Sequence, residues 1–219
     1  MLIVNKFKIR QLKKLFPKIY ATKRLVFESD SFLHKTGWIQ SLKNGYPCGK
    51  NGRELPWMNY AVISFLENRL KKSMSLFEFG SGYSSIFFSR LVNDVTAVEH
   101  NPEWIENIQD KLPANIKLIY CSLNINSEYC QIINKQNKKF DVIVVDGYDR
   151  INCIYHGLNS IKDDGVLILD DSNRTSYRDG IRILKERGYK SLQFVGLKPT
   201  GIDLEETTVF YKENNCLKV

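Results

Sequence analysis

Two glycines, Gly80 and Gly82, lie between an apolar run and a segment of helical character, in the string Glu-Phe-Gly-Ser-Gly-Tyr-Ser. Glycine allows the backbone to turn sharply and to approach a ligand closely, and the first turn of a helix offers unpaired N–H groups. Glu99 follows 19 residues after Gly80, near the spacing of roughly 20 residues at which an acid binds ribose hydroxyls in nucleotide-binding units. Together these signals predict a site for a nucleoside-type ligand.

A second group of chemically active side chains is acidic. Asp146 and the pair Asp170-Asp171 each follow an apolar run, and ligands of open α/β sheets bind at the carboxyl ends of such strands. Converging carboxylates need a cation, a proton or an arginine to balance their charge. Because Arg150 and Arg174 follow closely, the pattern favours an ion-pair network. The alternative is a Mg²⁺ or Ca²⁺ site, since these hard cations prefer oxygen ligands.

The elements that would position these residues alternate between strands and helices. Runs typical of strands occupy residues 76–79, 95–98, 116–120, 140–145, 166–169, 190–195 and 207–211, with helix-like segments between most of them. The alternation predicts an α/β fold with a parallel sheet that is covered on both faces. The last two runs are separated by a loop too short for a crossover helix, so we expect them to pair antiparallel. The turn Asp163-Asp164-Gly165 is expected to precede the fifth strand.

Glu78 stands two positions before the Gly80-x-Gly82 turn, which resembles the first motif of class I S-adenosylmethionine (SAM)-dependent methyltransferases. The resemblance covers roughly residues 56–212. It implies a Rossmann-like, seven-stranded, mostly parallel sheet of order 3-2-1-4-5-7-6, with SAM as the cofactor. It also implies that Glu78 binds the amino-acid part of SAM, that the turn lies under the methionine part and that Glu99 binds the ribose. Ser84 stands where this motif often has a third glycine, which makes the motif less specific.

The resemblance places further residues near SAM. Trp57 and Tyr60 open the helix before the first strand, where they either line the donor pocket or pack in the core. His100 lies either against the adenine or exposed in a turn. Asp146 resembles the fourth motif of the family, which faces the methyl group being transferred. The residues expected to contact SAM are Trp57, Tyr60, Glu78, Gly80, Ser81, Gly82, Ser84, Glu99, His100, Asp146 and Gly147.

The acceptor is less well defined. The strings Pro-Trp-Met-Asn-Tyr and Val-Glu-His-Asn-Pro-Glu-Trp resemble those of a small bacterial subgroup of undefined substrate, for which a sugar or another hydroxylated small molecule is the expected acceptor. A hydroxyl must lose its proton as the new bond forms. Asp146 is the first candidate for the base, followed by Asp149, His156 and Asp171. A metal at Asp146, Asp170 and Asp171 is less favoured, because metal-dependent catechol-type enzymes have Asn at the position of Asp171.

The net charge of +8 is concentrated at one end of the chain. Residues 1–27, which we call the arm, contain eight Lys and Arg and no acid, whereas the rest of the chain has 24 of each sign. A neutral body disfavours a nucleic-acid substrate. The arm combines its charge with apolar residues at a helical spacing interrupted by Pro17. It is expected either to pack its apolar stripe on the body or to contact an anionic membrane surface.

The rest of the sequence indicates how the chain is divided and in which compartment it works. Residues 1–55 are interpreted as a basic helical extension followed by a loop over 35–56, and residues 56–219 as the SAM-binding domain. No apolar run approaches the roughly 20 residues that span a bilayer. The five cysteines form no Cys-x-x-Cys pair, which disfavours a zinc site or disulfides and indicates a reducing cytoplasm. The pattern does not predict the oligomeric state.

Two other functions fit part of the pattern. Gly80-x-Gly82-x-x-Ser85 nearly matches the fingerprint of NAD-dependent oxidoreductases, but Ser85 stands where that fingerprint has a third glycine or alanine, and no Tyr-x-x-x-Lys follows. A non-catalytic protein that binds SAM and transfers nothing would share the donor motif. RNA methylation assisted by the arm is disfavoured, because the body is neutral and the chain lacks an Asn/Asp-Pro-Pro-aromatic string.

Overall fold

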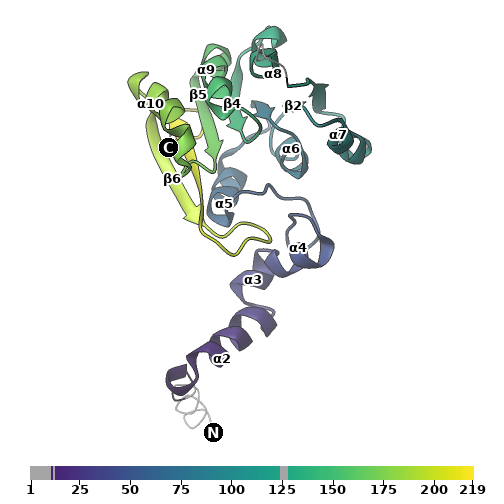
Figure 1. Ribbon diagram of the computed structural model, residues 1–219, viewed down its shortest axis with the longest axis vertical. Coiled ribbons are helices and arrows are strands. Elements are labelled where there is room, and N and C mark those ends of the chain that lie inside the picture. Colours follow the sequence, from purple (N-terminus) through teal and green to yellow (C-terminus); the bar gives the residue numbers. More distant parts are fainter. Residues whose placement is uncertain (1–10, 12, 124–127) are drawn as a thin grey trace.

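The computed structural model describes residues 11, 13–123 and 128–219, and the predictions for residues 1–10 and 12 lie outside this range. Seven strands form one sheet of order β3-β2-β1-β4-β5-β7-β6, which confirms the expected order (Figure 1). Strands β1 to β5 are parallel, and β7 pairs antiparallel with both β5 and β6. The strands are β1 (Ser75–Phe79), β2 (Asp94–Glu99), β3 (Ile116–Tyr120), β4 (Phe140–Val145), β5 (Ile161–Asp170), β6 (Lys190–Gly196) and β7 (Glu205–Tyr211).

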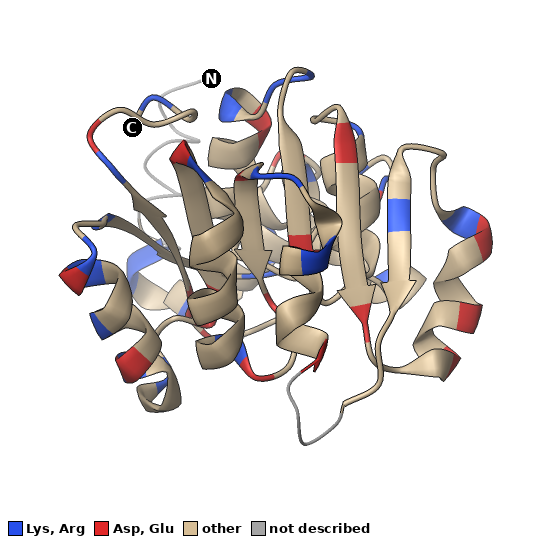
Figure 2. Ribbon diagram, turned by 90° about the horizontal axis from the view of Figure 1, so that it is seen from above, with Lys and Arg blue, Asp and Glu red and all other residues tan. Residues whose placement is uncertain are grey.

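Helices cover both faces of the sheet (Figure 2). Apolar residues of α5 (Tyr60–Arg69) and α6 (Tyr83–Ser89) pack on one face, and residues of α8 (Glu128–Gln131), α9 (Arg150–Ser160) and α10 (Arg178–Glu186) pack on the other. The central strand β4 is buried along its whole length, as expected for a parallel strand between two helical layers. The helix α7 (Pro102–Ile108) begins after Asn101, whose side chain accepts the Trp104 N–H at the N-cap.

The start of β5 differs from the prediction. Residues 163–165 were expected to form a turn ahead of the strand, whereas β5 already begins at Ile161. The register with β4 shifts between the pairs Phe140–Ile161 and Val142–Val166, so the segment around Gly165 forms an irregularity within one strand. The polar residues 163–165 do interrupt the regular pairing with β4, but the residues on both sides of them belong to β5.

The interpretation of residues 35–56 as a loop is wrong for part of that segment. Helix α4 (Trp38–Asn44) lies within it, between Gly37 and Gly45, whose φ angles are 90° and 72°. Gly37 precedes the first residue of the helix and Gly45 follows the last one. Both adopt the left-handed conformation, which costs glycine little. With α3 (Phe32–Lys35), this helix forms the neck of the molecule, residues 28–45. The neck is fastened to the body by the Trp38 indole, which donates to the Gly201 carbonyl at 2.8 Å.

The described part of the arm extends away from the body (Figure 1). It contains α2 (Pro17–Thr22) and the π-helical turn η1 (Lys23–Phe27), and Pro17 occupies the first turn of α2. The expectation that its apolar stripe packs on the body is wrong for these residues, because Leu15, Ile19 and Phe27 are 68%, 65% and 75% exposed. None of the helices over residues 11, 13–123 and 128–219 is long and apolar enough to cross a membrane.

Candidate functional site

The backbone of the glycine turn after β1 lies in direct contact with the backbone of the loop after β4. Gly80 has a φ of 93°, and a Cβ at this position would lie 3.2 Å from the Cα of Gly147. A Cβ on Gly147 would in turn lie 2.1 Å from the Tyr129 Oη and 2.8 Å from the Gly80 nitrogen. A side chain has no room at Gly147, and at Gly80 it would be both crowded and strained by the positive φ, so glycine at both positions permits the two loops to touch.

Glu99 joins the tips of β1 and β2. Its Oε2 accepts the Ser81 N–H at 3.1 Å, and its Oε1 accepts the N–H groups of His100 and Asn101 at 2.8 and 2.9 Å. The carboxylate is buried, and these donors compensate for the solvent it has lost. The acid and the glycine turn therefore lie on the same edge of the sheet and in direct contact.

A cavity of about 300 Å³ opens between these loops. A second hollow of about 240 Å³ adjoins it and shares Ser81, Ser84 and Asp146 with it. The first cavity is lined by Glu78, Gly80, Ser81, Ser84, Glu99, His100, Asp146, Gly147 and Tyr148. The hollow is lined by Pro47, Trp57, Ser81, Gly82, Tyr83, Ser84, Trp104 and Asp146. The structure thus gathers the residues expected to contact SAM along one continuous depression, with the exception of Tyr60.

Glu78 lies at the bottom of the first cavity. Its side chain is almost fully buried and accepts a hydrogen bond from the Ser85 hydroxyl. Burial raises the pKa of Glu78 to about 7, against the opposing effect of the Ser84 and Ser85 hydroxyls. A carboxyl group held this way changes its charge near neutral pH, which suits it to meet a cationic group of a ligand.

The carboxylates after β4 and β5 are neutralised by basic side chains. Arg150 donates to Asp146 at 2.9 Å and lies 3.4 Å from Asp171. Asp171 also pairs with Arg174 at 2.5 Å and faces Lys198 at 3.8 Å. This is the ion-pair network that the sequence favours. Burial raises the pKa of Asp146 to about 7, and Arg150 opposes that shift.

The third carboxylate of this group, Asp170, accepts the Thr207 hydroxyl at 2.5 Å, and burial raises its pKa. Arg150 additionally donates to the Asp170 carbonyl. Among the described residues, no group of three or more His, Cys, Asp and Glu side chains is arranged to hold a metal ion. The carboxylates of Asp146, Asp170 and Asp171 are paired with Arg150, Thr207 and Arg174.

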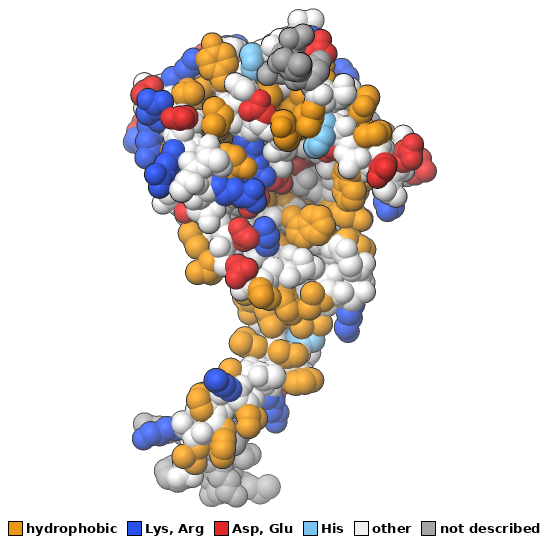
Figure 3. Space-filling view, viewed as in Figure 1, with side chains coloured by type: hydrophobic (Ala, Val, Ile, Leu, Met, Phe, Trp, Pro, Cys, Tyr) orange, Lys and Arg blue, Asp and Glu red, His pale blue; other side chains and the backbone are white. Residues whose placement is uncertain are grey.

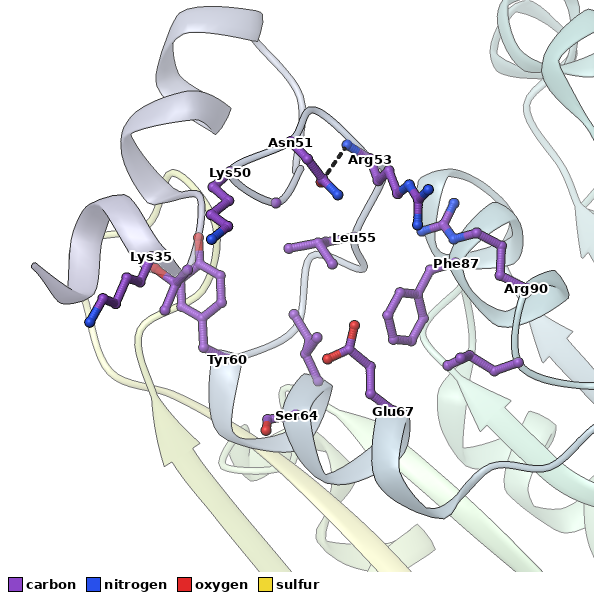
Figure 4. A pocket seen from close by; sticks show the side chains of 14 residues that line it. Lys35, Lys50, Asn51, Arg53, Leu55, Tyr60, Ser64, Glu67, Phe87 and Arg90 are labelled. Carbon is purple, nitrogen blue, oxygen red and sulfur yellow. Dashed lines mark hydrogen bonds between the residues drawn. The ribbon is translucent and has the colours of Figure 1, made fainter. Parts of the chain in front are cut away.

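Three predicted residues lie elsewhere. Tyr60 is buried beside a separate cavity of about 570 Å³, where Lys50, Arg53 and Arg90 also line the wall (Figure 4). His156 lies on α9 within 3.4 Å of Asn134, and it lines neither the cavity nor the adjoining hollow. Asp149 precedes α9 with a φ of 47° and accepts the Asn152 amide at 2.7 Å. Only Asp146 among the candidate bases lines the cavity.

Three aromatic residues that line the site were missed, namely Tyr83, Trp104 and Tyr148. Tyr148 lines the cavity, and its ring centroid lies 6.0 Å from that of His100. Trp104 donates from its indole to the Ser81 carbonyl at 2.7 Å and would contact a Cβ on Gly82 at 3.3 Å. Tyr148 follows Asp146-Gly147 directly, so its place could have been inferred from the strand end. Trp104 could not, because its contact depends on how α7 packs.

No family model matches the chain, and no curated protein matches it. Solved structures do resemble it. A proposed O-methyltransferase from Klebsiella pneumoniae has a TM-score of 0.56 at 16% identity, covering 90% of this chain and 96% of its own. An rRNA methylase from Streptococcus thermophilus has a TM-score of 0.53 at 13% identity, covering 68% and 93%. A proposed methyltransferase from Streptococcus mutans, solved in complex with SAH, has a TM-score of 0.50 at 16% identity, covering 68% and 94%. The chain therefore has the class I SAM-dependent methyltransferase fold.

Proposed function

We propose that this chain is a SAM-dependent methyltransferase that transfers the methyl group to a hydroxyl or another nucleophile of a small molecule or glycan. The observation that carries the proposal is the contact between Glu99 and the glycine turn at Ser81, beside a cavity that also reaches Asp146. A single ligand can then lie in this depression with its nucleoside end at Glu99 and its reacting end near Asp146. The resemblance of the first motif to that of known methyltransferases supports SAM as this ligand.

The protein would bind SAM through groups that are already in position. Within the described part of the chain, Glu99 Oε2 accepts a hydrogen bond from the Ser81 N–H alone, so it retains capacity for a ribose hydroxyl. Glu78, at the bottom of the cavity, would face the amino-acid part. His100 and Tyr148 flank the cavity with their rings and offer apolar surface to the adenine. Each of these groups binds or orients the cofactor without taking part in the bond change.

SAM supplies an electrophilic methyl group when bound. The remaining task of the protein is to align the acceptor with that carbon and to exclude water. For a hydroxyl acceptor, the methyl group would pass from the SAM sulfur to the acceptor oxygen, S-adenosylhomocysteine would leave, and a side chain of the protein would take the hydroxyl proton. Asp146 is our candidate for that base, because it lines both the cavity and the adjoining hollow and is a quarter exposed.

The proposal also covers the cellular compartment of the enzyme. We propose a reducing cytoplasm, since all five cysteines are free and the Cys130 and Cys153 sulfurs lie 3.4 Å apart without a bond. The similar structures carry different names, one for an rRNA methylase and one for a proposed O-methyltransferase. We favour a small-molecule or glycan acceptor, because none of the described residues that line the cavity or the adjoining hollow is Lys or Arg.

Titration calorimetry with SAM, S-adenosylhomocysteine and NAD tests the donor before any acceptor is known. We expect SAM and S-adenosylhomocysteine to bind at one site and to compete, and NAD not to bind. Binding of NAD alone would instead identify an oxidoreductase. If SAM binds but no methyl group reaches any of a panel of hydroxylated acceptors, including sugars and phenols, the non-catalytic alternative gains support.

A further inference from the structure

The described arm exposes an unusual amount of apolar surface. Leu15, Phe16 and Ile19 are 68%, 52% and 65% exposed, and Leu25, Val26 and Phe27 are 46%, 38% and 75% exposed. Figure 3 shows hydrophobic side chains along the arm and on the neck, and Phe32 on the neck is 50% exposed. Scattered apolar residues on a surface need no explanation, but a contiguous apolar patch indicates an interaction site.

The same segment is strongly basic. Its described residues include Lys13, Lys14, Lys18, Lys23 and Arg24, and the first acid in the chain is Glu28. Only Arg24 of these five forms an ion pair, with Glu28 at 3.6 Å. Lys13 lies over the Tyr20 ring at 4.8 Å. Four cations are therefore left without an acidic partner in the part of the arm that the structure describes.

We propose that the arm docks on an anionic lipid bilayer, with its apolar side chains at the boundary between headgroups and acyl chains. The free energy falls when exposed Leu, Ile and Phe side chains leave water, and Lys and Arg side chains are attracted to anionic headgroups. A short basic and apolar helix lies on such a surface without crossing it. The arm thus holds the body, and with it the methyl-transfer site, beside a membrane.

A second copy of the chain is a poorer match for the arm. The cavity of about 570 Å³ on the body presents Lys50, Arg53 and Arg90 around Leu55, together with one acid, Glu67 (Figure 4). Of these three cations, only Arg90 has an acidic partner, Glu54 at 2.9 Å. A basic segment from a neighbouring molecule would be repelled there, whereas an anionic bilayer complements the charge of the arm.

Co-sedimentation of the full chain with vesicles tests the proposal. We expect binding to vesicles of phosphatidylglycerol and phosphatidylcholine in equal amounts, and little binding to phosphatidylcholine alone. The variant Lys14→Gln/Lys18→Gln should lower the partition coefficient about 30-fold at low salt, from roughly fivefold per lysine. The variant Leu15→Ser/Ile19→Ser should lower it at least tenfold, because two buried apolar side chains are lost.

Matched controls lie on the body. Lys111→Gln/Lys139→Gln removes two exposed charges, and Ile202→Ser/Leu204→Ser removes two side chains that are 80% and 69% exposed. Both controls should bind vesicles like the unmodified chain. All four variants should keep their affinity for SAM, which separates this proposal from the proposed function.

Two outcomes would overturn the proposal. The first is equal vesicle binding by the unmodified chain and both arm variants, or no binding at all to the anionic vesicles. The second is a dimer, seen by light scattering, that Leu15→Ser/Ile19→Ser converts to a monomer. That result would mean that the apolar side chains of the arm pair two copies of the chain.

Discussion

The Glu99 carboxylate accepts the Ser81 N–H at 3.1 Å, so the acid at the end of β2 fixes the position of the glycine turn after β1. The sequence predicts that this acid binds a ribose. It also holds three backbone N–H groups that have no other partner among the described residues. The shape of the cavity and the charge that would recognise a ribose thus depend on one side chain.

Replacement of Glu99 should therefore affect both stability and cofactor binding. We expect Glu99→Gln to lower the free energy of unfolding by about 1–3 kcal/mol, because a buried N–H loses its charged acceptor. The affinity for SAM should fall about 10- to 100-fold. Urea unfolding and calorimetry measure the two effects. Glu106→Gln, an exposed acid on α7, should change neither, and a normal SAM affinity in Glu99→Gln would contradict the assigned role.

The close approach of the two loops predicts an effect at Gly147. A methyl group there would lie 2.9 Å from the Phe79 carbonyl carbon and 2.8 Å from the Gly80 nitrogen, so the backbone must move. We expect Gly147→Ala to abolish detectable SAM binding. Gly188 has a φ of 79° and nothing within 4 Å of a Cβ, so Gly188→Ala should cost about 1 kcal/mol of stability and leave SAM binding intact.

The proposed base predicts a pH profile. Asp146 must be ionised to accept a proton, and burial raises its pKa to about 7. We therefore expect kcat/KM to rise with pH and to level off above about 7. Asp146→Asn should keep SAM affinity within about threefold and lose roughly 10²- to 10⁴-fold in turnover. Unchanged turnover in this variant would remove Asp146 from the mechanism.

Glu78 predicts a pH dependence of stability. Its pKa is raised from 4.5 to about 7 in the folded chain, so between these values the folded state keeps a proton that the unfolded state has lost. The stabilisation is fully present below pH 4.5 and is lost as the pH rises through 7, by on the order of 3 kcal/mol. Thermal unfolding should show this loss. Glu78→Gln should flatten the profile between pH 5 and 7, and an equally steep profile would refute the assignment.

The ion-pair network predicts that the activity needs no divalent metal. Arg150 already neutralises Asp146 and Asp171 at 2.9 and 3.4 Å. We expect turnover to be unchanged after exhaustive treatment with EDTA. Arg150→Met should instead lower the free energy of unfolding by about 3–5 kcal/mol, because two carboxylates lose their shared partner. Loss of activity on chelation, restored by Mg²⁺, would show that a cation displaces Arg150 in the working enzyme.

Much of the sheet could be predicted, because its signals are local. The apolar run 140–145 and the short connection between β6 and β7 define a buried parallel strand and an antiparallel pair without knowledge of the rest of the chain. The co-location of Gly80 and Glu99 also follows, since neighbouring parallel strands bring their carboxyl ends to one edge.

The errors have a common origin in tertiary packing. Gly37 and Gly45 looked like loop residues, but they end α4, which is held by the distant Gly201. Tyr60 lies beside another cavity because its position on α5 faces the neck. There the centroid of its ring lies 5.8 Å from that of Phe32. The arm failed to pack on the body, although its composition alone is compatible with either arrangement.

The bond from Trp38 to Gly201 has a mechanical consequence. Gly201 belongs to the segment between β6 and β7, in which Lys198 faces Asp171 and Thr200 accepts the Trp57 indole N–H at 3.4 Å. One continuous set of contacts therefore links the neck to the rim of the candidate site. The neck that carries the arm is thus anchored to the same segment that contacts Trp57 and Asp171.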